Sequence, residues 1–159
     1  MPKKDAVCSA TLIILGNDLN PDIITDALDL QPSQAWRRGD NHSFNQADGT
    51  VCVYETIHKW GGWKRWLESD LRDMPLTAQL LHWSDLLMEK AVFIKGLKEK
   101  GHTIEMNCCV ITEASVVIQV PAQLQQKFGD LGVDLDVTFY AHQSKVKAKS
   151  RRPAKRTFR

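Results

Sequence analysis

The sequence predicts an α+β fold in which a single antiparallel-rich sheet carries one long and two short helices. Residues 102–111 and 133–140 alternate apolar and polar side chains with the period of two that marks a half-buried strand. Residues 75–100 instead repeat apolar side chains every three or four positions, as an amphipathic helix does. The predicted order is strand, helix, two strands, helix, two strands, helix, strand, which favours a sheet with its helices packed on one face.

In the first half of the chain, two apolar or β-branched runs and the short segment around Trp36 predict strands, and the polar stretch between the last two predicts a loop. The first strand leads into a short helix in which Asn20 is the expected N-cap and Pro21 the first helical residue. Gly61 and Gly62 are expected to end the third strand. The strands cover residues 7–15, 33–38 and 50–60, and the loop covers residues 41–49.

The second half of the chain is organised around the long helix, for which Gly101 is the expected C-cap. The strand after this helix is predicted to form a hairpin with residues 116–120. Pro121 opens a second short helix before the last strand, and Gly129 or Gly132 is expected to end it. One or two helical turns are also expected over residues 67–73.

Length and charge indicate one folded domain with a tail. A chain of 159 residues can bury a substantial core, and the domain is expected to span residues 6–142. Residues 143–159 hold eight Lys or Arg and no Asp or Glu, although the whole chain has a formal charge of only +2. The other 13 basic and 19 acidic residues give residues 1–142 a formal charge of −6. We therefore expect an acidic body followed by a flexible basic tail.

The composition favours a cytoplasmic protein without membrane contact. No apolar run approaches the roughly 20 residues of a membrane helix, and the N-terminus lacks the apolar core of a signal peptide. The four cysteines lie in strand-like segments without CxxC spacing, and Cys108 and Cys109 should point to opposite faces of their strand. The cysteines are therefore interpreted as small core hydrophobes in a reducing compartment.

Three segments resemble the bacterial domain-of-unknown-function family DUF4279. They are Leu12-Ile-Ile-Leu-Gly-Asn-Asp-Leu, then Pro21-Asp-Ile-Ile-Thr with Leu28, then Trp36-Arg-Arg-Gly-Asp. The resemblance extends over roughly residues 7–141 and leaves out the tail. It implies no activity and no catalytic residues, because none is established for the family. Some members lie near toxin genes and are regarded as candidate immunity proteins, so the resemblance implies a toxin as one kind of partner.

The most unusual local feature is the run Trp60-Gly-Gly-Trp63-Lys-Arg-Trp66, in which three large aromatic residues are interleaved with basic ones. Such a run can form a contact surface for a protein or for nucleobases. Alternatively, Trp60 and Trp66 cap the core and Trp63, beside the glycines, is the exposed one. The predicted partner-binding residues are Trp60, Trp63, Lys64, Arg65, Arg37 and Arg38.

Other constellations are explained by structure. Arg37 and Arg38 either contact a partner or an anion, or form a solvated turn with Asp40 after a core residue, Trp36. The acidic residues around the first helix lack the spacing of a calcium loop and are explained by turns and caps. The five histidines form no acid–base pair, and no nucleophile elbow or phosphate loop is present. We predict no catalytic residue, metal or cofactor; an enzyme would need a deep pocket that the sequence does not reveal.

The basic tail carries the strongest electrostatic signal. Positive charge without acidic residues can neutralise nucleic-acid phosphates, with binding that weakens as salt rises. The tail can equally dock on an acidic protein, or it can serve only to keep the protein soluble. The candidate nucleic-acid contacts are Lys145, Lys147, Lys149, Arg151, Arg152, Lys155 and Arg156.

These features together predict a non-enzymatic, immunity-like interaction module that binds and blocks an unknown partner protein. The prediction depends on the acidic body, the Trp-rich run and the lack of a catalytic motif. The alternative is a nucleic-acid-associated accessory protein that the tail anchors non-specifically.

Overall fold

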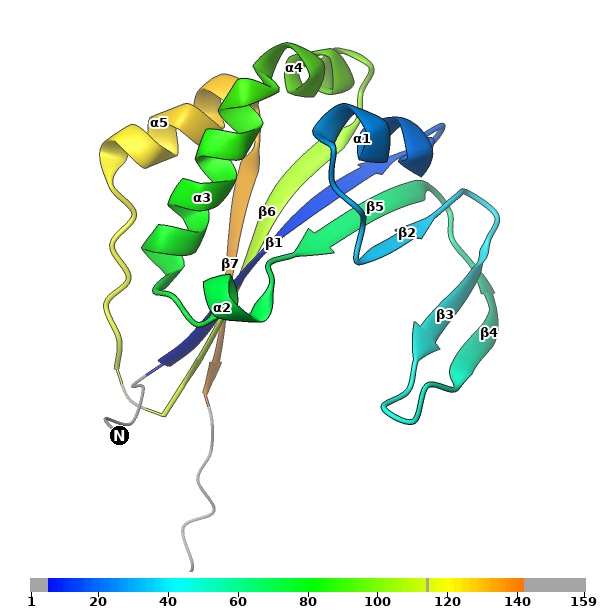
Figure 1. Ribbon diagram of the computed structural model, residues 1–159, viewed down its shortest axis with the longest axis horizontal. Coiled ribbons are helices and arrows are strands. Elements are labelled where there is room, and N and C mark those ends of the chain that lie inside the picture. Colours follow the sequence, from blue (N-terminus) through cyan, green and yellow to red (C-terminus); the bar gives the residue numbers. More distant parts are fainter. Residues whose placement is uncertain (1–5, 114, 142–159) are drawn as a thin grey trace, which may run out of the picture.

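The computed structural model describes residues 6–113 and 115–141, which form a five-stranded sheet with helices on one face (Figure 1). The strand order is β2-β5-β1-β6-β7, and β3 pairs with β4 in a separate two-stranded sheet. In chain order the elements are β1 (Ala6–Gly16), α1 (Pro21–Leu28), β2 (Gln34–Trp36), β3 (Asn41–Asn45), β4 (Val51–Ile57), β5 (Gly61–Trp66), α2 (Ser69–Arg72), α3 (Leu76–Glu89), α4 (Ala91–Glu99), β6 (Thr103–Thr112), α5 (Ala122–Leu131) and β7 (Asp134–Ala141).

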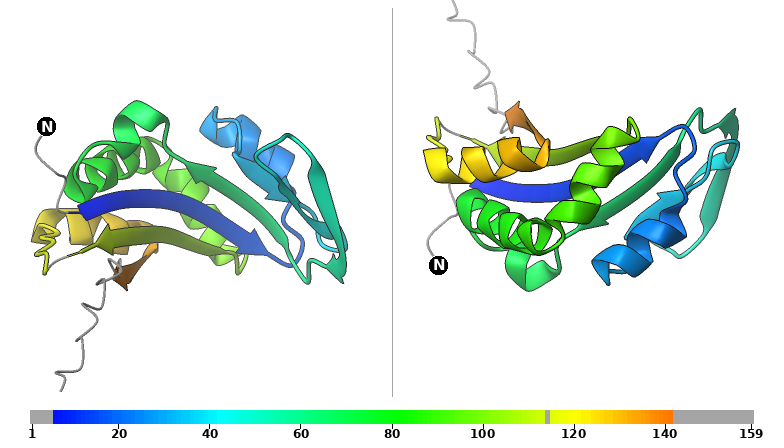
Figure 2. Two further views of the ribbon diagram at one scale, coloured as in Figure 1. Left: turned by 90° about the horizontal axis from the view of Figure 1, so that it is seen from below. Right: turned by 90° about the horizontal axis from the view of Figure 1, so that it is seen from above.

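β1 and β6 form the centre of the sheet because their apolar side chains alternate toward the helices. Leu12 lies opposite Met106 and Ile14 opposite Ile104, and all four side chains are fully buried. In each of the two strands, the alternate residues, such as Ile13 and Glu105, point to the other side of the sheet. Within the described residues no helix covers that side, as the two views in Figure 2 show. We call it the open face.

A side chain of α3 completes the hydrogen bonding of β1 where β5 ends. β5 pairs with β1 only from Thr11 onward, so the earlier β1 backbone has no strand on that side. The buried Gln79 lies there: its Oε1 accepts from Ala10 N at 2.9 Å and its Nε2 donates to Cys8 O at 3.0 Å. Trp83 Nε1 donates to Ala10 O at 3.1 Å. These side chains satisfy buried backbone groups that would otherwise lack partners.

Several predicted helix ends are confirmed. The side chain of Asn20 accepts a hydrogen bond from Asp22 N at 3.2 Å, and Pro21 is the first residue of α1. Gly101 follows α4 with a φ of 81°, and Gly132 follows α5 with a φ of 68°. Glycine is favoured in this left-handed conformation, which commonly ends helices.

The predicted orientation of the cysteines is also confirmed. Cys108 is fully buried on the helix-covered face, whereas Cys109 faces the other way, and all four cysteines are free. Burial raises the pKa of the Cys108 thiol to about 12. The thiol therefore stays protonated and packs as a small hydrophobe.

The α+β class is confirmed, but the sheet is mixed rather than antiparallel-rich, and the described residues hold five helices rather than three. β7 pairs parallel with β6 because α5 carries the chain back between them. Residues 116–120, predicted as a strand, are irregular. Their side chains Val116, Ile118 and Val120 pack against the core. Alternation in this segment reflects one-sided burial without strand pairing.

The predicted long helix is two helices that meet at Lys90, where φ is −107° and ψ is 19°. These angles lie outside the α-helical range. The apolar stripe continues across the break from Leu87 to Ile94, so periodicity alone does not reveal it. α3 packs on β1 and α4 packs on β6. The bend lets both helices follow a twisted sheet.

Gly61 and Gly62 begin β5 and do not end the preceding strand, which already stops at Ile57. A Cβ at Gly62 would lie 2.1 Å from the Trp36 ring, so the close packing of this ring requires glycine. Residues 41–45, predicted as a loop, form a strand that pairs with β4. The resulting β3–β4 hairpin projects from the sheet beyond β2 (Figure 1).

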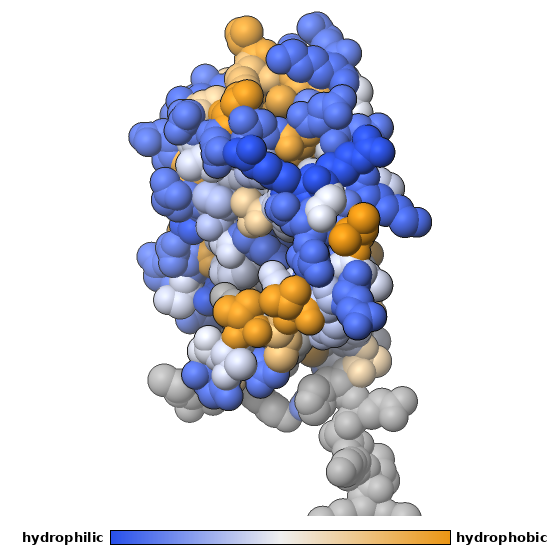
Figure 3. Space-filling view, turned by 90° about the vertical axis from the view of Figure 1, so that its right-hand side faces the viewer, coloured by the Kyte–Doolittle hydropathy of each residue, from blue (hydrophilic) through white to orange (hydrophobic). Residues whose placement is uncertain are grey.

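The side of the molecule that the hairpin forms is mostly hydrophilic, with a few separate apolar patches (Figure 3). Val51, Val53 and Ile57 are each more than half exposed. Backbone hydrogen bonds hold the base of the hairpin, where His58 N donates to Asp40 O at 2.8 Å. A two-stranded hairpin is only marginally stable by itself, so the hydrogen bonds at its base help to keep it folded and in place. Among the described residues, no helix is long and apolar enough to cross a membrane.

Candidate functional site

The exposed tryptophans lie on the open face. Lys64 and Trp66 of β5 point to this side, because the preceding Trp63 points to the helices and side chains alternate along a strand. Trp36 of β2 lies beside them, opposite Gly62. Trp66 is 40% exposed, and Trp60, just before β5, is 48% exposed. The open face therefore presents aromatic surface around a lysine.

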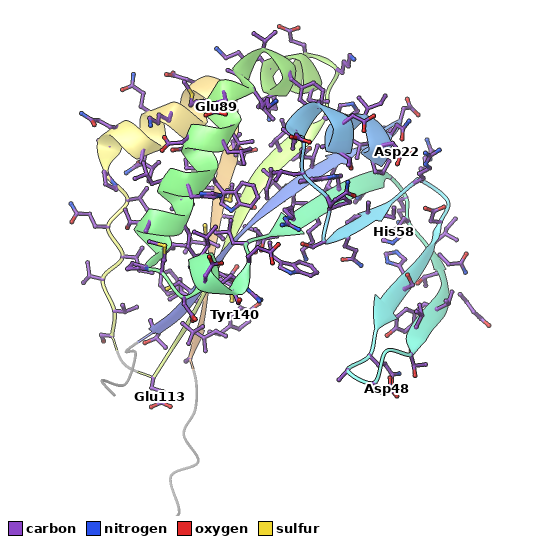
Figure 4. The ribbon with its side chains drawn as sticks, in the orientation of Figure 1. Asp22, Asp48, His58, Glu89, Glu113 and Tyr140 are labelled. Atoms are coloured by element: carbon purple, nitrogen blue, oxygen red, sulfur yellow. The ribbon has the colours of Figure 1, made fainter. Side chains whose placement is uncertain are left out.

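A stack of rings holds this aromatic surface against the hairpin. The Trp36 ring stacks on His58 with centroids 4.7 Å apart, and the His58 and His42 centroids are 3.6 Å apart. Trp36 Nε1 also donates to Trp60 O at 3.1 Å. Figure 4 shows His58 where the hairpin joins the sheet. The stack therefore fixes the Trp36 ring against His58, and the hydrogen bond fixes it relative to the backbone of Trp60.

Burial lowers the pKa of His58, and the neighbouring His42 lowers it further, whereas the Asp40 carboxylate raises it. His58 is consequently neutral at pH 7. A neutral imidazole stacks on Trp36 without placing a positive charge beside His42. The ring stack is therefore an arrangement suited to neutral pH.

Trp60 and Glu105 line one hollow on the open face, with a volume of about 340 Å³. Trp60 contributes an aromatic ring, and Glu105 of β6 contributes a carboxylate. The hollow is further lined by Leu15, Gly16, Asn17, Gly101 and Thr103. Aromatic faces and carboxylates both attract the charged ends of Lys and Arg side chains.

Carboxylates gather beside this hollow. Glu105 lies opposite Asp134 of β7, and Asp136 is the next residue of β7 that points to the open face. Partial burial raises the pKa of Glu105, and the carboxylates of Asp136 and Asp134 raise it further. Lys98 Nζ, 4.0 Å from Asp134, offsets part of this negative charge. This half of the open face therefore favours a positively charged group.

The predicted partner-binding residues of β5 and its approach divide between the two faces. Trp60 and Lys64 lie on the open face, whereas Trp63 and Arg65 point toward the helices. The expectation that Trp63 is the exposed tryptophan is wrong, because its side chain is fully buried. The spacing explains this: Trp63 is three residues from both Trp60 and Trp66, and an odd spacing along a strand reverses the face.

Arg37 and Arg38 lie in the turn between β2 and β3, and neither lines the hollow. The Arg37 guanidinium pairs with the Asp22 carboxylate at 2.6 Å and donates to Asn20 Oδ1 at 3.2 Å. Figure 4 shows Asp22 on the neighbouring α1. The predicted link to Asp40 exists through the backbone, since Arg37 N donates to Asp40 Oδ2 at 2.6 Å. Arg37 therefore fastens the turn to α1, while Arg38 is exposed.

Sequence reasoning did not identify Trp36, Trp66 and Glu105 as parts of one surface. Trp36 was expected in the core, but it is only partly buried and covers Gly62 from the open face. If Trp63 is taken as buried, the alternation of side chains along the strand places Trp66, three residues later, on the opposite, open face. Glu105 comes close to Trp60 only through the strand order, which no local pattern of the sequence contains.

Two predictions concern metal binding and the tail. Among residues 6–113 and 115–141, no group of three or more His, Cys, Asp or Glu is placed to hold a metal ion. The predicted nucleic-acid contacts, Lys145, Lys147, Lys149, Arg151, Arg152, Lys155 and Arg156, all lie outside the described residues.

Comparison with known proteins gives one match. The family model described as "Domain of unknown function (DUF4279)" matches residues 6–142. No curated protein and no solved structure matches the chain.

Proposed function

This chain belongs to the DUF4279 family, whose description states no activity. From the surface of the molecule, we propose that it is a non-enzymatic protein-interaction module. It binds a partner protein through the open face and blocks it, as an immunity protein does. The partner is basic, and it inserts a Lys or Arg side chain into the hollow between Trp60 and Glu105.

The hollow is the observation that carries this proposal. Trp60 is 48% exposed even though large aromatic side chains are usually buried, and Glu105 lies beside two further carboxylates. A cation over an aromatic ring gains about 0.5–2 kcal/mol, and a hydrogen bond to a carboxylate adds to it. Trp66 and Trp36 extend the apolar contact around this anchor, an arrangement typical of protein interfaces.

The same charges argue against nucleic acid as the ligand of this face. Glu105, Asp134 and Asp136 would lie beside the phosphates of any strand whose bases stacked on Trp60. Like charges at such distances repel, and the body carries a formal charge of −6 over residues 1–142. A basic protein meets attraction over the same surface.

Affinity capture with the full chain tests the proposal. The wild-type protein is expected to retain a basic protein from a lysate of its native host after nuclease treatment. Trp60→Ala and Glu105→Gln should each weaken binding of the recovered partner by at least about tenfold, the range of interface hot spots. Titration calorimetry of the purified pair measures the change.

The matched controls are Val92→Ala, which removes an exposed apolar side chain of α4, and Glu55→Gln, which removes an exposed carboxylate of β4. Both should bind the partner as the wild type does. Equal affinity of all four variants would contradict the placement of the site. Recovery of only acidic proteins would contradict the chemistry of the partner.

A second candidate function is favoured by the composition of the tail. Residues 143–159 contain eight Lys or Arg and no acidic residue, so they can anchor an accessory protein to DNA or RNA. Removal of these residues should abolish binding to a labelled duplex, and binding by the full chain should weaken steeply with added salt. Binding that survives the truncation would contradict this function.

A further inference from the structure

β7 forms an edge of the five-stranded sheet, and no strand of the described residues lies beyond it (Figure 2). It runs from Asp134 to Ala141, and apolar side chains are exposed along its second half. Val137 is 43% exposed, and Phe139 and Tyr140 are each 56% exposed. This edge therefore offers both unpaired backbone groups and apolar surface.

Most of the features that normally protect such an edge are missing from β7, whose only charged side chains, Asp134 and Asp136, lie at its start. Proteins blunt their edge strands with proline, lysine, bulges or a covering element. The β7 sequence DLDVTFYA contains no proline and no basic residue, and its register with β6 is unbroken from Asp134 to Ala141. The opposite edge, β2, is only three residues long. An edge with the properties of β7 is expected to be paired with another strand.

The charges along the chain select the partner strand and its direction. Asp134 and Asp136 lie at the start of β7, and the eight Lys or Arg of residues 143–159 follow its end. Antiparallel pairing of two β7 strands brings the acidic start of each copy toward the end of the other copy's β7, which the basic residues follow in sequence. Parallel pairing would set acidic residues against one another. We propose that β7 pairs antiparallel with β7 of a second copy, so that two sheets join across a two-fold axis.

The apolar residues favour a second copy over the chain's own tail. Pairing centred near Thr138 sets Val137 of each copy beside Phe139 of the other, which withdraws both side chains from water. Residues 143–159 offer only Val146 and Phe158 as large apolar side chains. A tail that folded back along β7 would therefore cover less of this apolar surface.

Sedimentation of the full chain at a series of concentrations tests the proposal. The expected mass is twice 18.0 kDa at high concentration and falls toward 18.0 kDa on dilution. Added salt should favour the monomer, because it screens the acidic and basic segments. Phe139→Lys and Tyr140→Lys should each raise the dissociation constant of the dimer by at least about tenfold. A mass of 18.0 kDa at every concentration overturns the proposal.

Two further variants locate the interface. Val92→Lys adds the same charge at a residue of α4 that is 90% exposed, and it should dimerise as the wild type does. Removal of residues 143–159 should weaken the dimer and abolish its salt dependence. A dimer that tolerates both edge lysines overturns the role of β7. A truncated dimer with unchanged affinity and salt response overturns the antiparallel charge pairing. Circular dichroism confirms that each variant is folded.

Discussion

Gln79 illustrates how much one residue can contribute to this fold. Its amide accepts from Ala10 N and donates to Cys8 O, two backbone groups that a strand would otherwise satisfy. In sequence, a glutamine within an amphipathic helix is assigned to the polar face, so no local pattern predicts its burial. The backbone of Cys8 and Ala10 needs Gln79 because β5 pairs with β1 only from Thr11 onward.

Gln79→Ala should lower the free energy of unfolding by roughly 2–4 kcal/mol, because buried backbone groups lose their partners. Urea denaturation measures the change. The matched control is Gln126→Ala on α5, where the side chain is exposed and the effect should stay within about 0.5 kcal/mol. Equal destabilisation by both variants would contradict this role.

Glu105 is stabilised in its protonated form by burial and by the neighbouring Asp136 and Asp134, which raise its pKa. A raised pKa favours folding at low pH, and this contribution is lost as the pH rises above 4.5 through the pKa of the folded state. Glu105→Gln should therefore raise the melting temperature at pH 7, and the gain should disappear below pH 4.5. The control is Glu55→Gln, which removes an exposed carboxylate of β4 and should change the melting temperature at pH 7 little.

The same substitution separates folding from binding. If Glu105→Gln stabilises the protein but weakens the partner complex, the carboxylate is kept for recognition at a cost in stability. A variant that is less stable at pH 7 would instead show that Glu105 has a favourable structural partner.

At the level of the elements, β2 pairs with β5 over three residues, and one close side-chain contact reinforces this pairing. Trp36 packs over Gly62, where an added Cβ would lie 2.1 Å from the ring. Gly62→Ala should displace Trp36, separate it from His58 and destabilise the fold by about 1–3 kcal/mol. Tryptophan fluorescence and thermal unfolding report the two effects. Gly129→Ala on α5 meets no atom within 4 Å and should instead stabilise the protein by up to about 1 kcal/mol.

Most elements follow from sequence patterns, and their arrangement does not. Alternation identifies β6 and β7, and the caps at Asn20 and Gly101 set real helix ends. Residues 116–120 alternate equally well, yet they form no strand, because alternation reports which side is buried and not which strand is adjacent. The candidate site is lost for the same reason: Trp60 and Glu105 come together only through the pairing of β5, β1 and β6.

Across the whole molecule, the two proposed surfaces are adjacent, and both use the carboxylates of Asp134 and Asp136. The hollow lies on the open face, whereas dimerisation uses the edge of β7. A two-fold axis perpendicular to the joined sheet would turn both open faces to the same side, so a dimer could bind two copies of a partner. Variants of Phe139 and Trp60 should therefore affect different measurements, namely the mass of the protein and its affinity for the partner.

The body is expected to fold without the tail. Among the described residues, every member of the buried core cluster lies between Ala10 and Val133, so removal of residues 143–159 leaves this cluster intact. The truncated chain should unfold in urea within about 0.5 kcal/mol of the full chain, measured at concentrations where both are monomeric. Its formal charge would be −6 instead of +2, so added salt should stabilise it more than the full chain. A loss of several kcal/mol would contradict an independent body and would show that the tail packs against it.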